Sequence, residues 1–342
     1  MGKKTQTTLQ ACFLLFLIAA TAAILHRHAS PQAYQKIGGA VFHTQYHITY
    51  QHSQNYRQDI EQLLHQVDQS LSSFNPHSTL SLINQNKRRE ADAWVERIFS
   101  LAQNVSQHTH GAFDITVAPL VNAWGFGFEK PAHVPNGNID SILQIVGYQK
   151  VRLEGHSIIK QHPAIQLDCS GIAKGFACDV VADFLERQGI SNYMIEIGGE
   201  IRANGQNPNG RPWVIGISTP KDDSLHVNIN DIASTMQLFH GALATSGNYR
   251  NFRILDGKKV AHTIDPRTGR PAQLSIVSSS VTAPTCAEAD AYATAFMVLG
   301  MEESQRVLAA QPQLQALFIY TDDDGQLKMW HTPHWQQPQD KQ

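Results

Sequence analysis

After residue 28 the chain mixes two kinds of hydrophobic spacing, and this mixture limits the folds that it can adopt. Apolar residues recur at helical spacing in residues 59–71, 91–109, 173–188 and 287–299, the last segment being halted by Gly300. Short alternating or apolar segments predict strands at residues 40–50, 165–168, 193–197, 213–218, 242–245, 276–281 and 317–321. Because helices and short strands are interleaved irregularly, we predict an α+β fold rather than a doubly wound parallel sheet.

Composition and charge narrow the function classes. The 342 residues are 42 % apolar and 16 % charged, which excludes wholesale disorder and allows two ordinary domains or one large one. Lysine and arginine number 27 against 29 acidic residues, a net charge of -2. A protein that binds nucleic acid by neutralising phosphates needs a basic surplus, so we expect no nucleic-acid partner.

The N-terminus has the pattern of an export signal or a membrane anchor. Lys3 and Lys4 precede an uncharged, mostly apolar run from residue 9 to residue 25. Small residues at 19–23 offer cleavage sites, whereas the run is also just long enough to span a bilayer. Both alternatives place the bulk of the chain outside the cytoplasm. The predicted organisation is a signal peptide or anchor at 1–28, a linker at 29–38, one functional domain at 39–332 and a tail at 333–342.

Cysteine usage predicts neither a disulfide framework nor a zinc site. Outside the apolar run only Cys169, Cys178 and Cys286 occur, an odd and sparse set. No C-x-x-C pair is present, so a structural zinc site is not expected.

Two segments concentrate glycine, acidic and small residues in ways that suit ligand binding. Residues 111–116 read Gly-Ala-Phe-Asp-Ile-Thr and lead to Trp-Gly-Phe-Gly at 124–127, which taken alone predicts a turn beside core aromatics. At 168–175 an acid closes a strand and Lys174 stands in the first turn of the following helix, where a phosphate would be attracted. The spacing is not that of a Walker loop, and an N-capping acid with an extended lysine is the alternative interpretation.

Two further segments carry candidate catalytic groups. His262 stands three residues before Asp265 in the turn sequence 262–269, and a histidine there is a candidate general base. Asp290 and Thr294 are four residues apart, hence on one face of the predicted helix. A carboxylate and a hydroxyl suit Mg²⁺, although a solvated acid beside a helix-facing threonine has the same spacing.

Taken in order, these segments resemble the ApbE family, the FAD:protein FMN transferases. The matching motifs are residues 111–117 together with 124–127, followed by 167–175, 197–201, 245–249, 262–271 and 289–294. They extend over roughly residues 40 to 320, and six ordered motifs are far more specific than any single one. At positions 42–44 the chain has Phe-His-Thr where the family commonly has Met-Gly-Thr.

The resemblance implies a fold and an activity. The fold would be α+β, with mixed, mostly antiparallel sheets and packed helices. The enzyme would be extracytoplasmic and would bind FAD and Mg²⁺. In the periplasm, the N-terminal segment would attach it to the inner membrane if that segment is not cleaved. It would move FMN onto a Thr or Ser hydroxyl of a partner flavoprotein and release AMP. Such partners resemble subunits of NADH:quinone reductase and related electron-transfer complexes.

The resemblance also implies the site residues. Gly171, Asp290 and Thr294 match the family's metal positions, Gly171 through its backbone carbonyl. The positions matching FAD contacts are Phe42, Phe74, Ala112, Phe113, Asp114, Asp168, Lys174 and Ile264. An acceptor hydroxyl is a weak nucleophile and needs a base, for which His262 is the candidate. Asp265 or metal-bound hydroxide could serve instead.

Two other functions fit the same residues. A periplasmic FAD pyrophosphatase would use the site with water as the nucleophile and give FMN and AMP. A flavin-binding protein without transfer chemistry would keep the FAD contacts but needs no metal pair, so the presence of both Asp290 and Thr294 argues against it.

Overall fold

A computed structural model describes residue 21 and residues 33–128, 139–219, 232–247, 252–255, 258–272 and 275–335. Apart from residue 21, the predicted signal or anchor at residues 1–28 lies outside these ranges, as do residues 336–342 of the predicted tail. Within the described ranges, none of the helices combines the length and the apolar character that crossing a bilayer requires.

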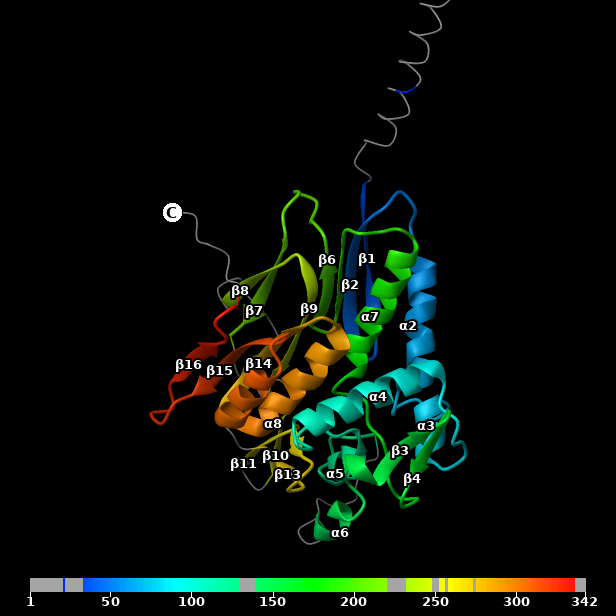
Figure 1. Ribbon diagram of the computed structural model, residues 1–342, viewed down its shortest axis with the longest axis vertical. Coiled ribbons are helices and arrows are strands. Elements are labelled where there is room, and N and C mark those ends of the chain that lie inside the picture. Colours follow the sequence, from blue (N-terminus) through cyan, green and yellow to red (C-terminus); the bar gives the residue numbers. More distant parts are fainter. Residues whose placement is uncertain are drawn as a thin grey trace, which may run out of the picture.

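One antiparallel sheet of eight strands forms the centre of the molecule (Figure 1). Its strands, in spatial order, are β1 (Tyr34–Val41), β2 (Thr44–Gln51), β5 (Tyr193–Ile197), β6 (Glu200–Asn204), β9 (His240–Gly247), β14 (Ile276–Ala283), β15 (Gln315–Thr321) and β16 (Leu327–His331). Every neighbouring pair runs antiparallel. The α+β prediction is therefore confirmed.

Four helices cover one face of this sheet (Figure 1). They are α2 (Arg57–Leu71), α4 (Ala93–His108), α7 (Ala173–Arg187) and α8 (Cys286–Ala310). Helices α7 and α8 pack directly on the sheet, α2 packs on α7, and α4 packs across α8 and α2. Their apolar stripes, which the helical spacing predicts, together form the main hydrophobic core. Asp92 caps α4 by accepting the backbone N–H groups of Trp94 and Val95, which explains where that helix begins.

The other face of the sheet carries a two-stranded ribbon of β7 (Trp213–Ser218) and β8 (Ile232–Leu238). Alternate residues of a strand point to opposite faces. Trp213, Ile215 and Ile217 accordingly pack with Leu243 of the central sheet in a second, smaller core.

Short elements form the region below the sheet in Figure 1. They are α3 (Thr79–Asn84), the 3₁₀ turns η1 (Ile115–Val117) and η2 (Tyr148–Lys150), α5 (Ala118–Ala123), α6 (Ile139–Leu143), and the paired strands β3 (Val151–Glu154) with β4 (Ser157–Lys160), β10 (Phe252–Leu255) with β11 (Lys258–Ala261), and β12 (Ile264–Asp265) with β13 (Arg270–Pro271). Leu120, Val146 and Ile264 form a third small core there.

The prediction of a single strand at residues 40–50 is wrong. The segment holds the end of β1, a two-residue turn and most of β2. Phe42 and His43 form the turn with positive φ angles of 51° and 58°, so the glycine or asparagine that normally marks such a turn is missing. Because β1 begins at Tyr34, the prediction of a linker at 29–38 is also wrong for residues 34–38.

The prediction of a strand at residues 165–168 is wrong as well. Its apolar residues Ile165 and Leu167 are buried, but the segment pairs with a side chain instead of a strand. The Asn84 side chain accepts the Leu167 N–H at 2.7 Å and donates to the Leu167 carbonyl at 2.8 Å. Asp168 donates its N–H to the Ile115 carbonyl. At Gly300 the backbone leaves helical geometry (φ 73°) as predicted, but α8 resumes immediately and ends at Ala310.

Candidate functional site

A cavity of about 760 Å³ lies where the ends of β6 and β9 meet the helix layer. Its wall draws on the turn between β5 and β6, the first turn of α7, the middle of α8 and one edge of β7. Of the residues expected at the site, it contains Phe74, Ala112, Phe113, Asp114, Asp168, Gly171, Lys174, His262, Ile264, Asp290 and Thr294. Positions up to 220 residues apart in the sequence therefore share one hollow.

Phe42 is the exception, because it is not part of the cavity wall. It lies in the turn between β1 and β2, and its half-buried side chain packs against the main core. The ring centroid of its neighbour His43 lies 6.1 Å from that of Phe74, a residue of the cavity wall. The cavity gives no support to the expected contact between Phe42 and the cofactor.

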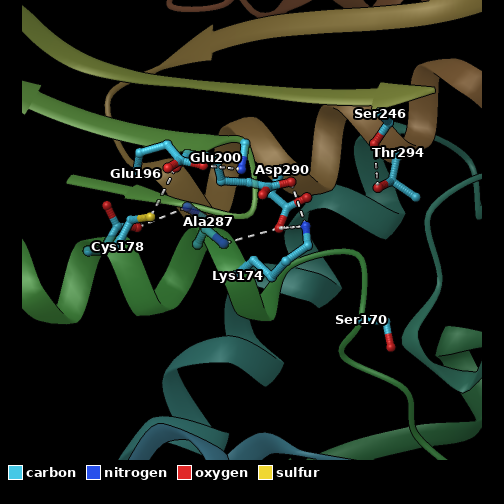
Figure 2. A network of polar contacts seen from close by, with 12 residues as sticks. Ser170, Lys174, Cys178, Glu196, Glu200, Ser246, Ala287, Asp290 and Thr294 are labelled. Atoms are coloured by element: carbon cyan, nitrogen blue, oxygen red, sulfur yellow. Dashed lines mark hydrogen bonds and ion pairs between the residues drawn. The ribbon is translucent and has the colours of Figure 1, made fainter. Parts of the chain in front are cut away.

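Three charged side chains form the polar centre of the cavity (Figure 2). The Lys174 ammonium lies 2.5 Å from Glu200 Oε1 and 3.9 Å from Asp290 Oδ2. The N–H of Gly175 donates to the same Asp290 oxygen at 3.1 Å. Asp290 and Glu200 are 2 % and 3 % exposed, whereas 31 % of the Lys174 side chain is open to solvent.

The protonation of these groups follows from burial and mutual charge. Burial raises the pKa of both carboxyls, and the Lys174 ammonium opposes that rise. Burial lowers the pKa of Lys174, but the charges of Asp290 and Glu200 outweigh it and raise the pKa overall. Lys174 is thus a fixed cation shared by two carboxyl groups. When both are ionised, the centre has one uncompensated negative charge, which suits a bound cation.

Asp290 is held in place by the close approach of α7 and α8. A Cβ atom at Gly175 would lie 2.3 Å from the Cys286 carbonyl oxygen, so only glycine allows this spacing. Asp179 on α7 accepts the backbone N–H groups of Cys286 and Ala287, both at 2.9 Å, and so caps the first turn of α8. Asp290 follows one turn later. Sequence reasoning missed both Gly175 and Asp179, whose roles depend on a partner helix more than 100 residues away.

Thr294 lies one further turn along α8, beside Gly171. A Cβ atom at Gly171 would be 3.1 Å from Thr294 Oγ1, and that hydroxyl is 3.2 Å from Ser246 Oγ (Figure 2). Carboxylate, hydroxyl and backbone carbonyl oxygens are the donors that Mg²⁺ accepts. This donor set fits the expected metal. Within the described ranges, no cluster of three or more His, Cys, Asp or Glu side chains offers another metal site.

Asp114 and Asp168 organise the backbone around the cavity. Asp114 accepts from the Thr116 N–H and hydroxyl and from the Tyr148 N–H, at 2.6–2.8 Å. Its burial raises its pKa, against the effect of these hydrogen bonds. Asp168 accepts from the N–H and hydroxyl of Ser170. Both carboxyls thus shape the loops that form the wall.

The two candidate protein bases differ in their surroundings. His262 lines the cavity, with its ring 6.4 Å from that of Phe126. Asp265 is not part of the wall, and both of its oxygens accept from the Arg267 guanidinium at 2.9 Å. This arrangement favours His262 over Asp265 as the base.

Glu200 is the charged cavity residue that sequence reasoning left without a role. It follows the two-residue turn Gly198–Gly199, whose φ angles of 63° and 102° require glycine in practice. Two glycines between apolar strands are a recognisable hairpin signal. The hairpin could therefore be predicted from the sequence, but the ion pair between Glu200 and Lys174 could not.

Comparisons with known proteins agree with this geometry. The model of the ApbE family matches residues 42–318. The chain is 38 % identical to the FAD:protein FMN transferase of Vibrio cholerae, over 84 % of this chain and 88 % of that protein. It is 34 % identical to the protein of the same name in Escherichia coli K12, over 82 % and 80 %.

Solved structures give the same result. The flavin transferase ApbE from Vibrio cholerae superposes with a TM-score of 0.78 at 36 % identity, over 89 % of this chain and 98 % of that one. The apo form of the flavinyl transferase ApbE from Pseudomonas stutzeri also gives a TM-score of 0.78, at 28 % identity and with 89 % and 96 % covered.

Proposed function

Because the chain belongs to the ApbE family and is an FAD:protein FMN transferase, we propose that it uses Mg²⁺ and transfers FMN to a Thr or Ser hydroxyl of a partner flavoprotein. The product is a phosphoester through the ribityl phosphate, and AMP is released. The observation that carries the proposal is that one cavity collects the predicted FAD-binding, metal and base residues other than Phe42.

The cavity has the size and the mixed lining of a cofactor site. Its volume of about 760 Å³ lies within the usual range for small-molecule pockets. Phe113, Phe126 and Ile264 provide apolar surface, and Lys174 and Asp290 supply the charged centre. In this assignment residues 112–114 contact the adenosine part of FAD.

Lys174 is suited to hold the pyrophosphate of FAD. It stands in the first turn of α7, where the helix dipole also attracts anions. Its raised pKa keeps the ammonium charged throughout the neutral range. Mg²⁺, held by Asp290, Thr294 and the Gly171 carbonyl, would supply the remaining charge neutralisation during phosphoryl transfer.

His262 would accept the proton of the acceptor hydroxyl. The hydroxyl oxygen then attacks the phosphorus of the FMN half, and the bond from that phosphorus to the oxygen of AMP breaks. AMP leaves with the bonding electron pair, and the proton stays on the histidine until solvent removes it. A neutral imidazole is needed for this step, because a protonated ring has no lone pair left to accept the hydroxyl proton.

One incubation distinguishes the candidate functions. The purified protein is mixed with FAD, Mg²⁺ and a candidate acceptor subunit, and the acceptor is weighed by mass spectrometry while AMP is quantified. A gain of one FMN phosphoester with matching AMP supports transfer. Free FMN and AMP formed equally without acceptor support a pyrophosphatase. FAD binding with no AMP supports a flavin-binding protein. The matched control is an acceptor whose target Thr or Ser is replaced by Ala.

We propose that the reaction takes place in the periplasm, at the inner membrane. The support is the basic start and apolar run within residues 1–28. An acceptor in a membrane-bound electron-transfer complex resembling NADH:quinone reductase would then be within reach. A reporter that is active only in the periplasm, fused to the C-terminus, should be active. Activity of a cytoplasmic reporter instead would contradict this location.

A further inference from the structure

One carboxylate oxygen of Glu200 has no hydrogen-bond partner among the described residues. The side chain is 3 % exposed, and Oε1 accepts from Lys174 at 2.5 Å. Oε2 is buried and has no hydrogen-bond partner within the described part of the chain. Burying a carboxylate oxygen without a partner is costly, so the position of Glu200 calls for a reason beyond packing.

The distances around Lys174 suggest that reason. The ammonium lies 2.5 Å from Glu200 but 3.9 Å from Asp290. If Glu200 could not accept from it as an anion, Asp290 would be the remaining carboxylate within ion-pair distance among the described residues. A direct pair with Lys174 would then engage the carboxylate that the metal requires.

We infer that Glu200 is a positioning residue that holds the Lys174 ammonium away from Asp290, and so keeps Asp290 available to a divalent cation. The inference rests on the metal site of the proposed function and adds a residue to it. Lys174 stays near enough to bind the pyrophosphate of FAD, because Glu200 decides only which carboxylate the ammonium contacts.

The surroundings fix Glu200 well enough for this role. It is the first residue of β6 and pairs with Ile197 across the Gly198–Gly199 turn. The thiol of Cys178 on α7 donates to its carbonyl at 3.4 Å. The turn also confines the lysine, since a Cβ atom at Gly198 would lie 3.3 Å from Lys174 Cδ. Both partners of the short ion pair are therefore anchored by the backbone around them (Figure 2).

A double-mutant cycle on metal binding tests the inference, because loss of the Glu200 charge alone would also weaken cation binding. The dissociation constant for Mn²⁺ is measured by electron paramagnetic resonance on the full chain and on Glu200→Gln, Lys174→Met and the double variant. We expect Glu200→Gln to weaken Mn²⁺ binding roughly 10- to 100-fold, the usual cost of losing an outer-sphere partner. With Lys174→Met already present, the same change should cost less than about threefold, because no ammonium is left to compete.

Equal losses in both backgrounds would overturn the inference, since Glu200 would then act as a ligand or through its charge alone. Glu200→Asp keeps the negative charge but shortens the side chain, so it should weaken Mn²⁺ binding if the position of the carboxylate matters. Mn²⁺ binding as tight as that of the wild type would contradict the inference. Glu196→Gln is the matched control, because Glu196 precedes the same turn and bonds His47 and the Gly199 N–H instead of Lys174. Absence of Mn²⁺ binding by the wild type would refute the proposed metal site itself, and the inference with it.

Discussion

Replacing Gly175 by alanine should both destabilise the protein and weaken its metal site. The new Cβ atom would lie 2.3 Å from the Cys286 carbonyl oxygen, 2.6 Å from its carbon and 2.8 Å from the Ala287 nitrogen. All three atoms belong to the backbone of the first turn of α8, so no side chain can rotate away. The helices would have to separate by about 1 Å to restore ordinary contact.

The magnitude is a difference between two opposing effects. Overpacking a close contact costs about 1–3 kcal/mol, and more where only backbone can move. Alanine gains up to about 1 kcal/mol over glycine inside a helix. We therefore expect Gly175→Ala to lower the free energy of unfolding by about 1–2 kcal/mol. The Gly175 N–H also donates to Asp290, so a shift of α7 should weaken Mn²⁺ binding as well.

Urea unfolding, with the same m value for all variants, measures the change in the free energy of unfolding. Mn²⁺ titration measures the change in metal affinity. Gly216→Ala is the matched control, because its nearest neighbour is the flexible Ile232 side chain at 3.2 Å. It should change stability by less than about 1 kcal/mol. A Gly175→Ala protein that is as stable as the wild type, or more stable, would refute the claim that α7 and α8 meet this closely.

Three further predictions concern the same site. His262→Ala should lower the single-turnover transfer rate roughly 100- to 10,000-fold, because a general base acts in the transition state. The FAD affinity of this variant, measured by fluorescence, should change little. An unchanged transfer rate would exclude His262 as the base. Asp290→Ala should abolish transfer at limiting Mg²⁺ while the protein stays folded. Thr294→Ala should have a smaller effect, because a neutral hydroxyl contributes less to Mg²⁺ binding than a carboxylate does. Full activity of the Asp290 variant would contradict the metal assignment. Burial raises the pKa of Asp179 to about 6, although two backbone N–H groups and Arg202 oppose it. The native state therefore binds this proton more tightly than the unfolded chain, and the stabilisation is complete below about pH 4 and lost as the pH rises through about 6. Relative to Asp179→Asn, the wild type should lose up to about 3 kcal/mol over that range in urea titrations, and parallel pH profiles would contradict the shift.

Local spacing predicted much of the fold, whereas most of the site residues were predicted from the resemblance of the ordered motifs to the ApbE family. The strand predicted at residues 193–197 and the one at 213–218 match β5 and β7 residue for residue. The four-residue spacing of Asp290 and Thr294 correctly placed both on one face of a helix that lines the cavity. Such features depend on the periodicity of one segment, which neighbouring residues set by themselves.

The tertiary structure decided every feature that needed a distant partner. The segment at 165–168 has the composition of a strand, but the Asn84 side chain takes the backbone groups that a neighbouring strand would use. Asp265 is a different case, because the Arg267 guanidinium that pairs with both of its oxygens is only two residues away.

From the sequence by itself, the ordered motifs predicted most of the charged side chains that line the cavity, but not Glu200. The sequence left open which carboxylate would hold Lys174. That depends on the spacing of α7, β6 and α8, and thus on Gly175 and Asp179, which bring together segments more than 100 residues apart. Interactions of this kind form only when the chain is packed, so no local pattern encodes them.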